Sequence, residues 1–444
     1  MGQKSNKKQP ATLFEQDGIP KINEAFPLAL QHVLAMIVGC VTPSIILASL
    51  AGLSPGDKII LVQAALFMAA IATLMQLFRA GTFFGSGLPM IMGVSFAYLP
   101  TLQALVVEKD LATIFGAQLI GGCVAVIVGL NVKRLLKWFP PFITGTVVFT
   151  IGLSLYPTAL NYMAGGVGSE DYGGMKNWII AFFTLAVVTG FNHFGKGILK
   201  LSSILIGIAA GYAVAFALGM VNFDSVASAG IIQLPKPLYF GMKFEWSSII
   251  TLGILFVINA VQSIGDFSAT TSGGMERLPE TDELRGGIVA YGASNVAASL
   301  FGGLPLATYS QNVGIVSTTK VVNKVVFVMA SIIIMLAGLV PKFSAILTTI
   351  PQCVLGGATI SVFASITMTG LKLISSEKFS YRNTSIVGLS VALGMGITQV
   401  PDALVNFPAW AITIFGKSPV VIATISALFL NLILPGREED KKEA

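Results

Sequence analysis

Long apolar runs separated by short polar loops dominate this chain and restrict it to one environment. Of the 444 residues, 54% are hydrophobic and 11% are charged, and the mean hydropathy is +0.81. Soluble domains average about 25% charged residues. Because lipid offers backbone polar groups no hydrogen-bond partners, a chain of this kind must satisfy those groups within its own helices. The sequence therefore predicts an all-α polytopic membrane protein.

Fourteen apolar segments predict transmembrane spans, most of them close to the ~20 residues that cross a bilayer. An even number of spans places both termini on one side. Most of the 27 Lys and Arg residues fall in the inner segments if the N-terminus is inside, which indicates that both termini are cytoplasmic. The predicted spans are 27–49, 58–79, 82–105, 112–132, 138–157, 176–193, 201–220, 247–270, 286–302, 304–320, 322–341, 349–371, 384–400 and 417–435.

The third and tenth spans are interrupted in the same way. Both contain Gly-Leu-Pro, at Gly87–Pro89 and at Gly303–Pro305. Irregular backbone at membrane depth is tolerated only where it lines a site enclosed by protein. Two such breaks seven spans apart predict a seven-plus-seven inverted repeat, with short strands in the broken spans and a substrate near the membrane midplane.

Asp266 is the clear exception to the rule that acidic residues lie in loops. It falls in the predicted eighth span, and a carboxylate inside a span marks a functional site by default. Gln262 lies four residues earlier, so both side chains share one helical face. The alternative is that Asp266 only hydrogen-bonds the broken segments and holds them in shape.

Three further places in the spans carry candidate side chains. The amides of Gln311 and Asn312 offer donors and acceptors to a planar heterocycle, or they cap backbone groups freed at the break. The ring of Tyr98 can stack on a flat ligand, although such a ring can equally belong to the core. For His32, a packed and hydrogen-bonded role is favoured over a role as ligand or proton carrier.

Several classes of function have no support in the sequence. There is no carboxylate pair at depth, no His/Cys ligand set, no phosphate-binding loop and no Ser/His/Asp arrangement, so neither an enzyme nor a bound cofactor or metal is expected. Three cysteines lie in apolar stretches, where they act as small packing residues: Cys40, Cys123 and Cys353. The lipid-embedded character also argues against nucleic-acid binding.

Three motifs resemble those of the nucleobase–ascorbate transporters. Gln311-Asn312-Val-Gly314, followed by four residues and then Thr319-Lys320, resembles the signature of that family. Gln31-His32 resembles its first-span motif, and Ser263-Ile-Gly-Asp266 resembles its eighth-span motif. The spacing of the motifs covers essentially the whole chain.

The resemblance implies a domain organisation and a mechanism. Residues 27–132 and 247–348 would form a mobile core domain, and residues 133–220 and 349–435 a gate domain that forms a homodimer. The core would move as an elevator, with cytoplasmic tails at 1–26 and 436–444.

The resemblance also implies a substrate site between the strands of spans 3 and 10 and the face of span 8. The stacking aromatic of the family falls on Tyr98, and the span-10 contacts fall on Ser310 and Gln311. Glutamine at position 311 resembles the carriers of xanthine or uric acid, whereas uracil carriers tend to have glutamate there. Two acids of the family are replaced here, by Gln262 in span 8 and by Tyr291 in span 9.

The sequence thus predicts a plasma-membrane transporter of purine bases, xanthine or uric acid. Coupling would run through a proton carried by Asp266, or through Na⁺ held by backbone carbonyls at the breaks. A first alternative is an uncoupled nucleobase facilitator, because Gln262 and Tyr291 are neutral. A second is an anion transporter of the sulfate-permease type, which the net charge of +6 and the dipoles of the broken helices would suit.

Overall fold

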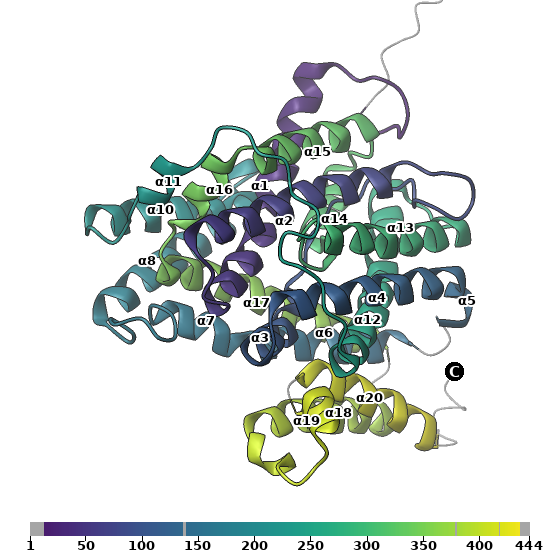
Figure 1. The fold of residues 1–444 in the computed structure, drawn as a ribbon. Coiled ribbons are helices and arrows are strands. Elements are labelled where there is room, and N and C mark those ends of the chain that lie inside the picture. The colour runs from purple at the N-terminus through teal and green to yellow at the C-terminus, as the bar shows by residue number, and fades with distance from the viewer. Residues whose placement is uncertain (1–12, 136–138, 378–379, 417, 436–444) are drawn as a thin grey trace, which may run out of the picture.

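The described part of the chain folds almost entirely into helices (Figure 1), and it also contains a small two-stranded sheet. The structure is a computed structural model that describes residues 13–135, 139–377, 380–416 and 418–435. The predicted tail at 436–444 lies outside these residues. The elements are α1 (Ile22–Leu50), α2 (Pro55–Leu77), β1 (Met92–Val94), η1 (Phe96–Tyr98), α3 (Leu99–Glu108), α4 (Leu111–Leu130), α5 (Val132–Leu135), α6 (Pro141–Ser154), α7 (Tyr156–Met163), α8 (Met175–Phe194), α9 (Ile198–Leu201), α10 (Ser203–Ala217), α11 (Asp224–Ser228), α12 (Trp246–Met275), α13 (Thr281–Leu300), β2 (Leu306–Thr308), α14 (Ser310–Thr319), α15 (Lys324–Leu339), α16 (Pro341–Thr348), α17 (Gln352–Ile374), α18 (Tyr381–Gln399), η2 (Pro401–Leu404), α19 (Ala409–Phe415) and α20 (Pro419–Ile433).

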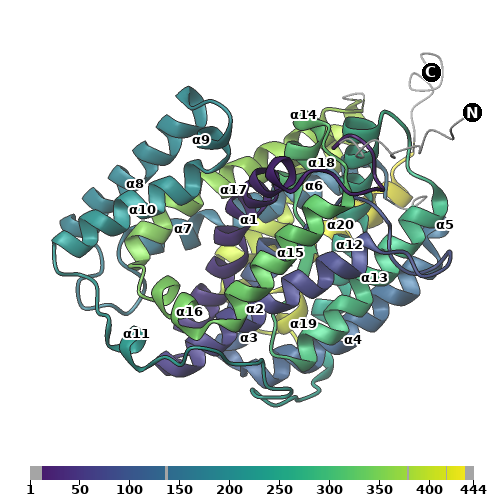
Figure 2. The same cartoon turned by 90° about the horizontal axis from the view of Figure 1, so that it is seen from above.

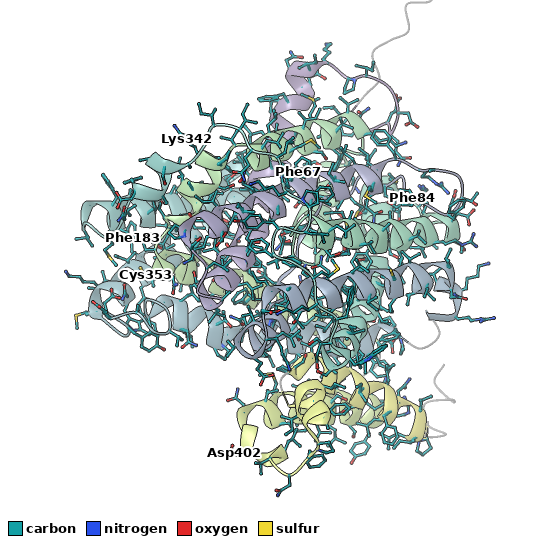
Figure 3. The ribbon with its side chains drawn as sticks, viewed as in Figure 1. Phe67, Phe84, Phe183, Lys342, Cys353 and Asp402 are labelled. Atoms are coloured by element: carbon teal, nitrogen blue, oxygen red, sulfur yellow. The ribbon has the colours of Figure 1, made fainter. Side chains whose placement is uncertain are left out.

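The helices have the length and composition of a polytopic membrane protein. Within the described ranges, seven helices are long and apolar enough to cross a bilayer, or eight if α15 and α16, bent by 80°, form one span. Large apolar side chains on α8 are exposed, among them Phe182 and Phe183. Figure 3 labels Phe183. Such a surface suits contact with lipid chains rather than water.

Local sequence explains where several helices begin. α2 starts after Ser54, whose hydroxyl accepts a hydrogen bond from the amide of Asp57 at 3.2 Å. α12 starts after Glu245, whose carboxylate accepts from the amide of Ser248 at 2.9 Å. α13 starts with a reciprocal capping box between Glu280 and Glu283.

The two strands pair antiparallel, with Met92 opposite Thr308 and Val94 opposite Leu306. All their residues are buried, so each free edge needs a partner inside the protein. A side chain from a neighbouring helix supplies one at each edge. The Thr73 hydroxyl on α2 accepts from the Met92 amide at 3.0 Å, and the Asn295 amide oxygen on α13 accepts from the Leu306 amide at 2.7 Å.

The helices pack as two groups. The first surrounds the strands: α4 packs on α12 and α13, and α2 packs on α15 and α1. In the second group, α17 packs on α6, α7 and α8, and α18 packs on α20. Figure 2 shows α4 and α13 at one side of the molecule and α8 and α10 at the other.

Glycine lets the main helix pair of each group approach closely. A Cβ on Gly292 of α13 would lie 2.7 Å from the carbonyl oxygen of Gly122 on α4. In the second group, a Cβ on Gly145 of α6 would lie 2.8 Å from the carbonyl oxygen of Gly370 on α17. Small residues at such crossings are how membrane helices bring their backbones together.

The described part of the predicted N-terminal tail is bound to the first group. The Leu13 carbonyl accepts from the amides of Val322 and Asn323 at 3.1 and 3.2 Å. The Gln16 side chain donates to the carbonyl of Gly87 at 3.1 Å. Helix α1 begins at Ile22, within the range 1–26 that the sequence predicts as a cytoplasmic tail.

Candidate functional site

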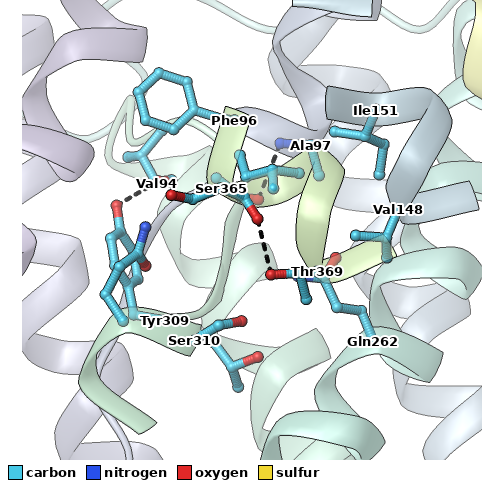
Figure 4. A pocket seen from close by; sticks show the side chains of 14 residues that line it. Val94, Phe96, Ala97, Val148, Ile151, Gln262, Tyr309, Ser310, Ser365 and Thr369 are labelled. Atoms are coloured by element: carbon cyan, nitrogen blue, oxygen red, sulfur yellow. Dashed lines mark hydrogen bonds between the residues drawn. The ribbon is translucent and has the colours of Figure 1, made fainter. Parts of the chain in front are cut away.

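A cavity of about 220 Å³ lies where the strand pair meets the second helix group (Figure 4). This is below the range of about 300–1,000 Å³ usual for drug-sized ligands, so it fits a smaller one. Its lining residues come from β1 and η1, β2 and α14, α12, α6 and α17: Val94, Ser95, Phe96, Ala97, Val148, Ile151, Gln262, Thr308, Tyr309, Ser310, Gln311, Ser365, Ile366 and Thr369.

The two broken segments reach the cavity in the same manner. Each strand ends there and is followed at once by a helix, with η1 starting at Phe96 and α14 starting at Ser310. The positive end of the dipole of α14 therefore lies beside the cavity, whereas the η1 amides of Ala97 and Tyr98 are already donated to Ser95. This arrangement favours carbonyl oxygens or other electron-rich atoms on a ligand.

Gln262 and Gln311 both line the cavity, as the sequence predicts for residues that contact substrate. The Oε1 atom of Gln262 is buried and has no hydrogen-bond partner among the described residues. A buried amide oxygen without a partner is costly, so it is available to a donor on a bound ligand. Gln311 is exposed and also lines an adjoining cavity.

Asp266 is buried beside the cavity but is not part of its lining. Its Oδ2 accepts from the Thr308 hydroxyl at 2.5 Å, and its Oδ1 accepts from the Ser310 hydroxyl at 2.8 Å. Both carboxylate oxygens are therefore engaged by the second broken segment. This geometry favours the alternative in which Asp266 holds that segment in shape, and it places Ser310 at the cavity wall.

His32 and Asn312 contact each other away from the cavity. The Asn312 amide nitrogen donates to the His32 carbonyl and to its Nδ1, both at 3.0 Å. The His32 ring lies 4.6 Å from that of Phe327, measured between centroids. The pair ties α14 to α1, which is the packed role that the sequence favours for His32.

Tyr98 is not in the lining, in contrast to its expected role as the stacking ring. It follows the cavity-lining residues of η1, and its side chain is fully buried behind them. Its hydroxyl is hydrogen-bonded to that of Tyr291, and its ring lies 5.0 Å from that of Phe256. Tyr98 thus packs against α12 and α13, whereas Phe96 of the same short helix lines the cavity.

Tyr309 is a lining residue that the sequence reasoning missed. Its hydroxyl donates to the Val94 carbonyl at 2.6 Å, which ties the two broken segments together. The ring lies against Gly93 of β1, where a Cβ would be 2.5 Å from Cε2 of Tyr309. A glycine inside a buried strand was the signal for such a close approach.

The residues from α6 and α17 were also missed. In the sequence, Val148 and Ile151 resemble ordinary residues of a membrane span. Ser365 and Thr369 resemble small polar residues within an apolar helix. The sequence carries no signal that brings these helices to the strands. A second cavity of about 630 Å³ adjoins this one and shares Gln311 and Ser365 with it.

Among the residues that the structure describes, no group of three or more His, Cys, Asp or Glu could hold a metal ion.

Similarity to known proteins shows the family to which the chain belongs. The family model for xanthine and uric acid permeases, described as "Permease family", matches residues 23–403. The chain belongs to this permease family. It is the family whose motifs the sequence resembles, and its members are transporters rather than enzymes.

Two curated relatives align with the permease over nearly its whole length. The xanthine permease of Bacillus subtilis is 36% identical over 91% of this chain and 92% of the relative. The uric acid permease PucK of the same organism is 35% identical over 94% of this chain and 96% of the relative.

A solved structure with the same fold comes from another class of transporter. The transmembrane domain of a cyanobacterium bicarbonate transporter, BicA, matches with a TM-score of 0.60 at 15% identity, covering 91% of this permease and 97% of that domain. At this identity the likeness shows the fold alone.

Proposed function

We propose that this permease transports oxidised purine bases, xanthine or uric acid. The observation that carries the proposal is the cavity at the strand pair, where Gln262 and Gln311 present amides beside hydroxyl groups in a small volume. An oxidised purine carries N–H and C=O groups around a flat ring, which these side chains can read. The names of the two curated relatives agree with this substrate class.

Substitution of Gln311 tests the proposal. Gln311→Ala removes hydrogen bonds to the base and is expected to weaken xanthine and uric acid binding by about 5- to 150-fold, the equivalent of about 1–3 kcal/mol. Gln311→Glu is expected to shift preference toward uracil. Purine affinity that stays unchanged in both variants, measured on purified protein, would reduce Gln311 to a helix cap.

The proposed architecture has fourteen spans in a seven-plus-seven inverted repeat, with β1 and β2 in spans 3 and 10. Each predicted span overlaps a helix, or a strand with its following helix, in the described residues. The antiparallel pairing of two strands that follow equivalent Gly-Leu-Pro breaks further supports this reading. Cysteines introduced singly at loop positions and labelled from one side of the membrane test it, since adjacent loops must alternate in accessibility.

The proposed mechanism is an elevator movement of a core domain, residues 27–132 and 247–348, against a gate domain, residues 133–220 and 349–435. The cavity supports this division because its walls come from both helix groups. A disulfide between cysteines placed at Ala97 and Ile151 should stop transport reversibly. Undiminished transport through the cross-linked protein would contradict the movement.

Transport is proposed in two forms, coupled and uncoupled. In the coupled form, a proton carried by Asp266, or Na⁺ at the breaks, would drive accumulation of the substrate. An uncoupled facilitator is the second candidate, and it draws support from neutral Gln262 in the cavity and from the two hydroxyls that engage Asp266. Accumulation in proteoliposomes with and without a proton or Na⁺ gradient separates the forms, because a facilitator only equilibrates its substrate.

The remaining proposals concern the cellular setting. We place the permease in the plasma membrane, with both termini cytoplasmic and the gate domains of two copies forming a homodimer. The excess of Lys and Arg in the inner segments supports this orientation.

A further inference from the structure

The wall of the cavity formed by α17 carries two hydroxyl groups, Ser365 and Thr369, one helical turn apart (Figure 4). Both residues are exposed in the structure, although α17 packs tightly against α6 along its buried side. They face the opening bounded by Gln262 and Ser310 on the opposite wall. A ligand in the cavity therefore has polar groups on both sides.

The hydroxyl protons on this wall are already donated to backbone carbonyls within α17. The Ser365 hydroxyl donates to the carbonyl of Ser361 at 3.1 Å, and the Thr369 hydroxyl donates to the carbonyl of Ser365 at 2.9 Å. A hydroxyl has one proton and two lone pairs. With the proton held by the helix, each oxygen offers only lone pairs to the cavity.

The same holds on the opposite wall. The hydroxyl protons of Thr308 and Ser310 are donated to the carboxylate of Asp266, so their oxygens also present lone pairs. Four cavity hydroxyls from three elements are thus acceptors. The side-chain groups that can donate are the amides of Gln262 and Gln311 and the hydroxyl of Ser95, whose oxygen accepts from the Ala97 amide.

We propose that Ser365 and Thr369 are specificity-determining residues that accept hydrogen bonds from ring N–H groups of the substrate. The inference rests on the proposed transport of oxidised purines and assigns their N–H edge to α17. Xanthine and uric acid are rich in ring N–H donors. A base methylated at the matching nitrogen has no donor to offer and leaves the hydroxyl oxygen without a partner.

The inference is tested by pairing protein variants with methylated ligands. Ser365→Ala and Thr369→Val remove the acceptors with little change of shape, and binding of xanthine and of each singly N-methylated xanthine is measured on the purified full-length protein. Thr384→Val and Ser385→Ala on α18 are the controls, because their hydroxyls donate to the carbonyls of Ser380 and Tyr381 in the same way, outside the cavity.

The expected result is a specific loss. At least one α17 variant binds xanthine about 5- to 150-fold more weakly than the controls, because a buried N–H loses its acceptor. For the xanthine methylated at the matching nitrogen, the same variant shows no loss relative to wild type. The conservative variants Ser365→Thr and Thr369→Ser keep the acceptor and are expected to retain xanthine binding. They test the same two positions if Ser365→Ala or Thr369→Val does not fold.

Two results would overturn the inference, and they differ from failure of the proposed function. One is equal weakening of all the xanthines, methylated or not, which would mean a change of shape. The other is unchanged xanthine binding in both α17 variants. A wild-type protein that binds neither xanthine nor uric acid would instead overturn the proposed function, and the inference with it.

Discussion

Asp266 and Gln262 lie one helical turn apart on α12, yet they face different partners. The carboxylate of Asp266 accepts hydrogen bonds from Thr308 and Ser310, whereas the amide of Gln262 lines the cavity. The side chain that reaches the ligand space is therefore neutral. Asp266 holds Ser310, which lines the cavity, and this contact makes Asp266 a positioning residue for the cavity wall.

Replacement of Asp266 tests that role. In Asp266→Asn the amide nitrogen cannot accept a hydrogen bond, so one buried hydroxyl loses its partner, and the free energy of unfolding should fall by about 1–3 kcal/mol. Purine affinity should fall with it because Ser310 is released. Exposed Asp224→Asn on α11 is the control, and both are measured by thermal unfolding and ligand binding. Wild-type stability combined with lost gradient-driven accumulation would assign Asp266 to proton transfer instead.

The buried hydroxyl pair of Tyr98 and Tyr291 joins η1 to α13 directly behind the cavity. Tyr98→Phe or Tyr291→Phe alone leaves one hydroxyl buried without this partner, whereas the double variant removes both. The single changes should each cost about 1–3 kcal/mol, and the double less than their sum. Tyr162→Phe, also buried but on α7, is the control in thermal unfolding. Strictly additive losses would show that the two hydroxyls are not coupled.

The strand pair is the element on which the site depends. Its partners are a threonine on α2 and an asparagine on α13, and Tyr309, which lines the cavity, lies over Gly93. Each of these two helical partners belongs to the same half of the chain as the strand it binds, whereas the pairing of β1 with β2 and the hydrogen bond from Tyr309 to Val94 join the two halves. The pair is a rigid support for the cavity-lining residues rather than a loose connection.

A methyl group on β1 should disturb this support. In Gly93→Ala the new Cβ would lie 2.5 Å from the Tyr309 ring, so the ring or the strand must shift. Overpacking of this kind costs about 1–3 kcal/mol, and purine affinity should fall because Tyr309 lines the cavity. Gly388→Ala on α18 is the control, since its Cβ meets no atom within 4 Å. Equal stability and affinity in both variants would contradict the packing of Tyr309 on Gly93.

Sequence and structure agree most closely at the breaks. Proline, glycine and amides at membrane depth have few physical explanations, so Gln311 could be predicted as a cavity residue. Ser310 was implied by the family resemblance alone, and Gln262 by that resemblance and by its shared helical face with Asp266. Tyr98 could not be placed, because the direction of a side chain after a strand depends on the turn that follows it. Helices α6 and α17 could not be predicted as cavity walls, because Val148 and Ile151 have the composition of lipid-facing residues.

At the scale of the whole molecule, the cavity lies where the strand pair and α12 meet α6 and α17. The fold is shared with a bicarbonate transporter, so it does not by itself select a substrate. The family match and the chemistry of the cavity support the choice of an oxidised purine as the substrate. The central claim is that this fold, with amides and acceptor hydroxyls at its strand pair, carries oxidised purines.

Uptake by the purified permease in proteoliposomes tests the claim most directly. Labelled xanthine, uric acid, uracil and sulfate are offered separately, each with and without a proton gradient, and protein-free liposomes serve as the control. The account predicts saturable uptake of xanthine or uric acid, little uptake of uracil and none of sulfate. Uptake of sulfate or uracil without uptake of either purine would contradict it.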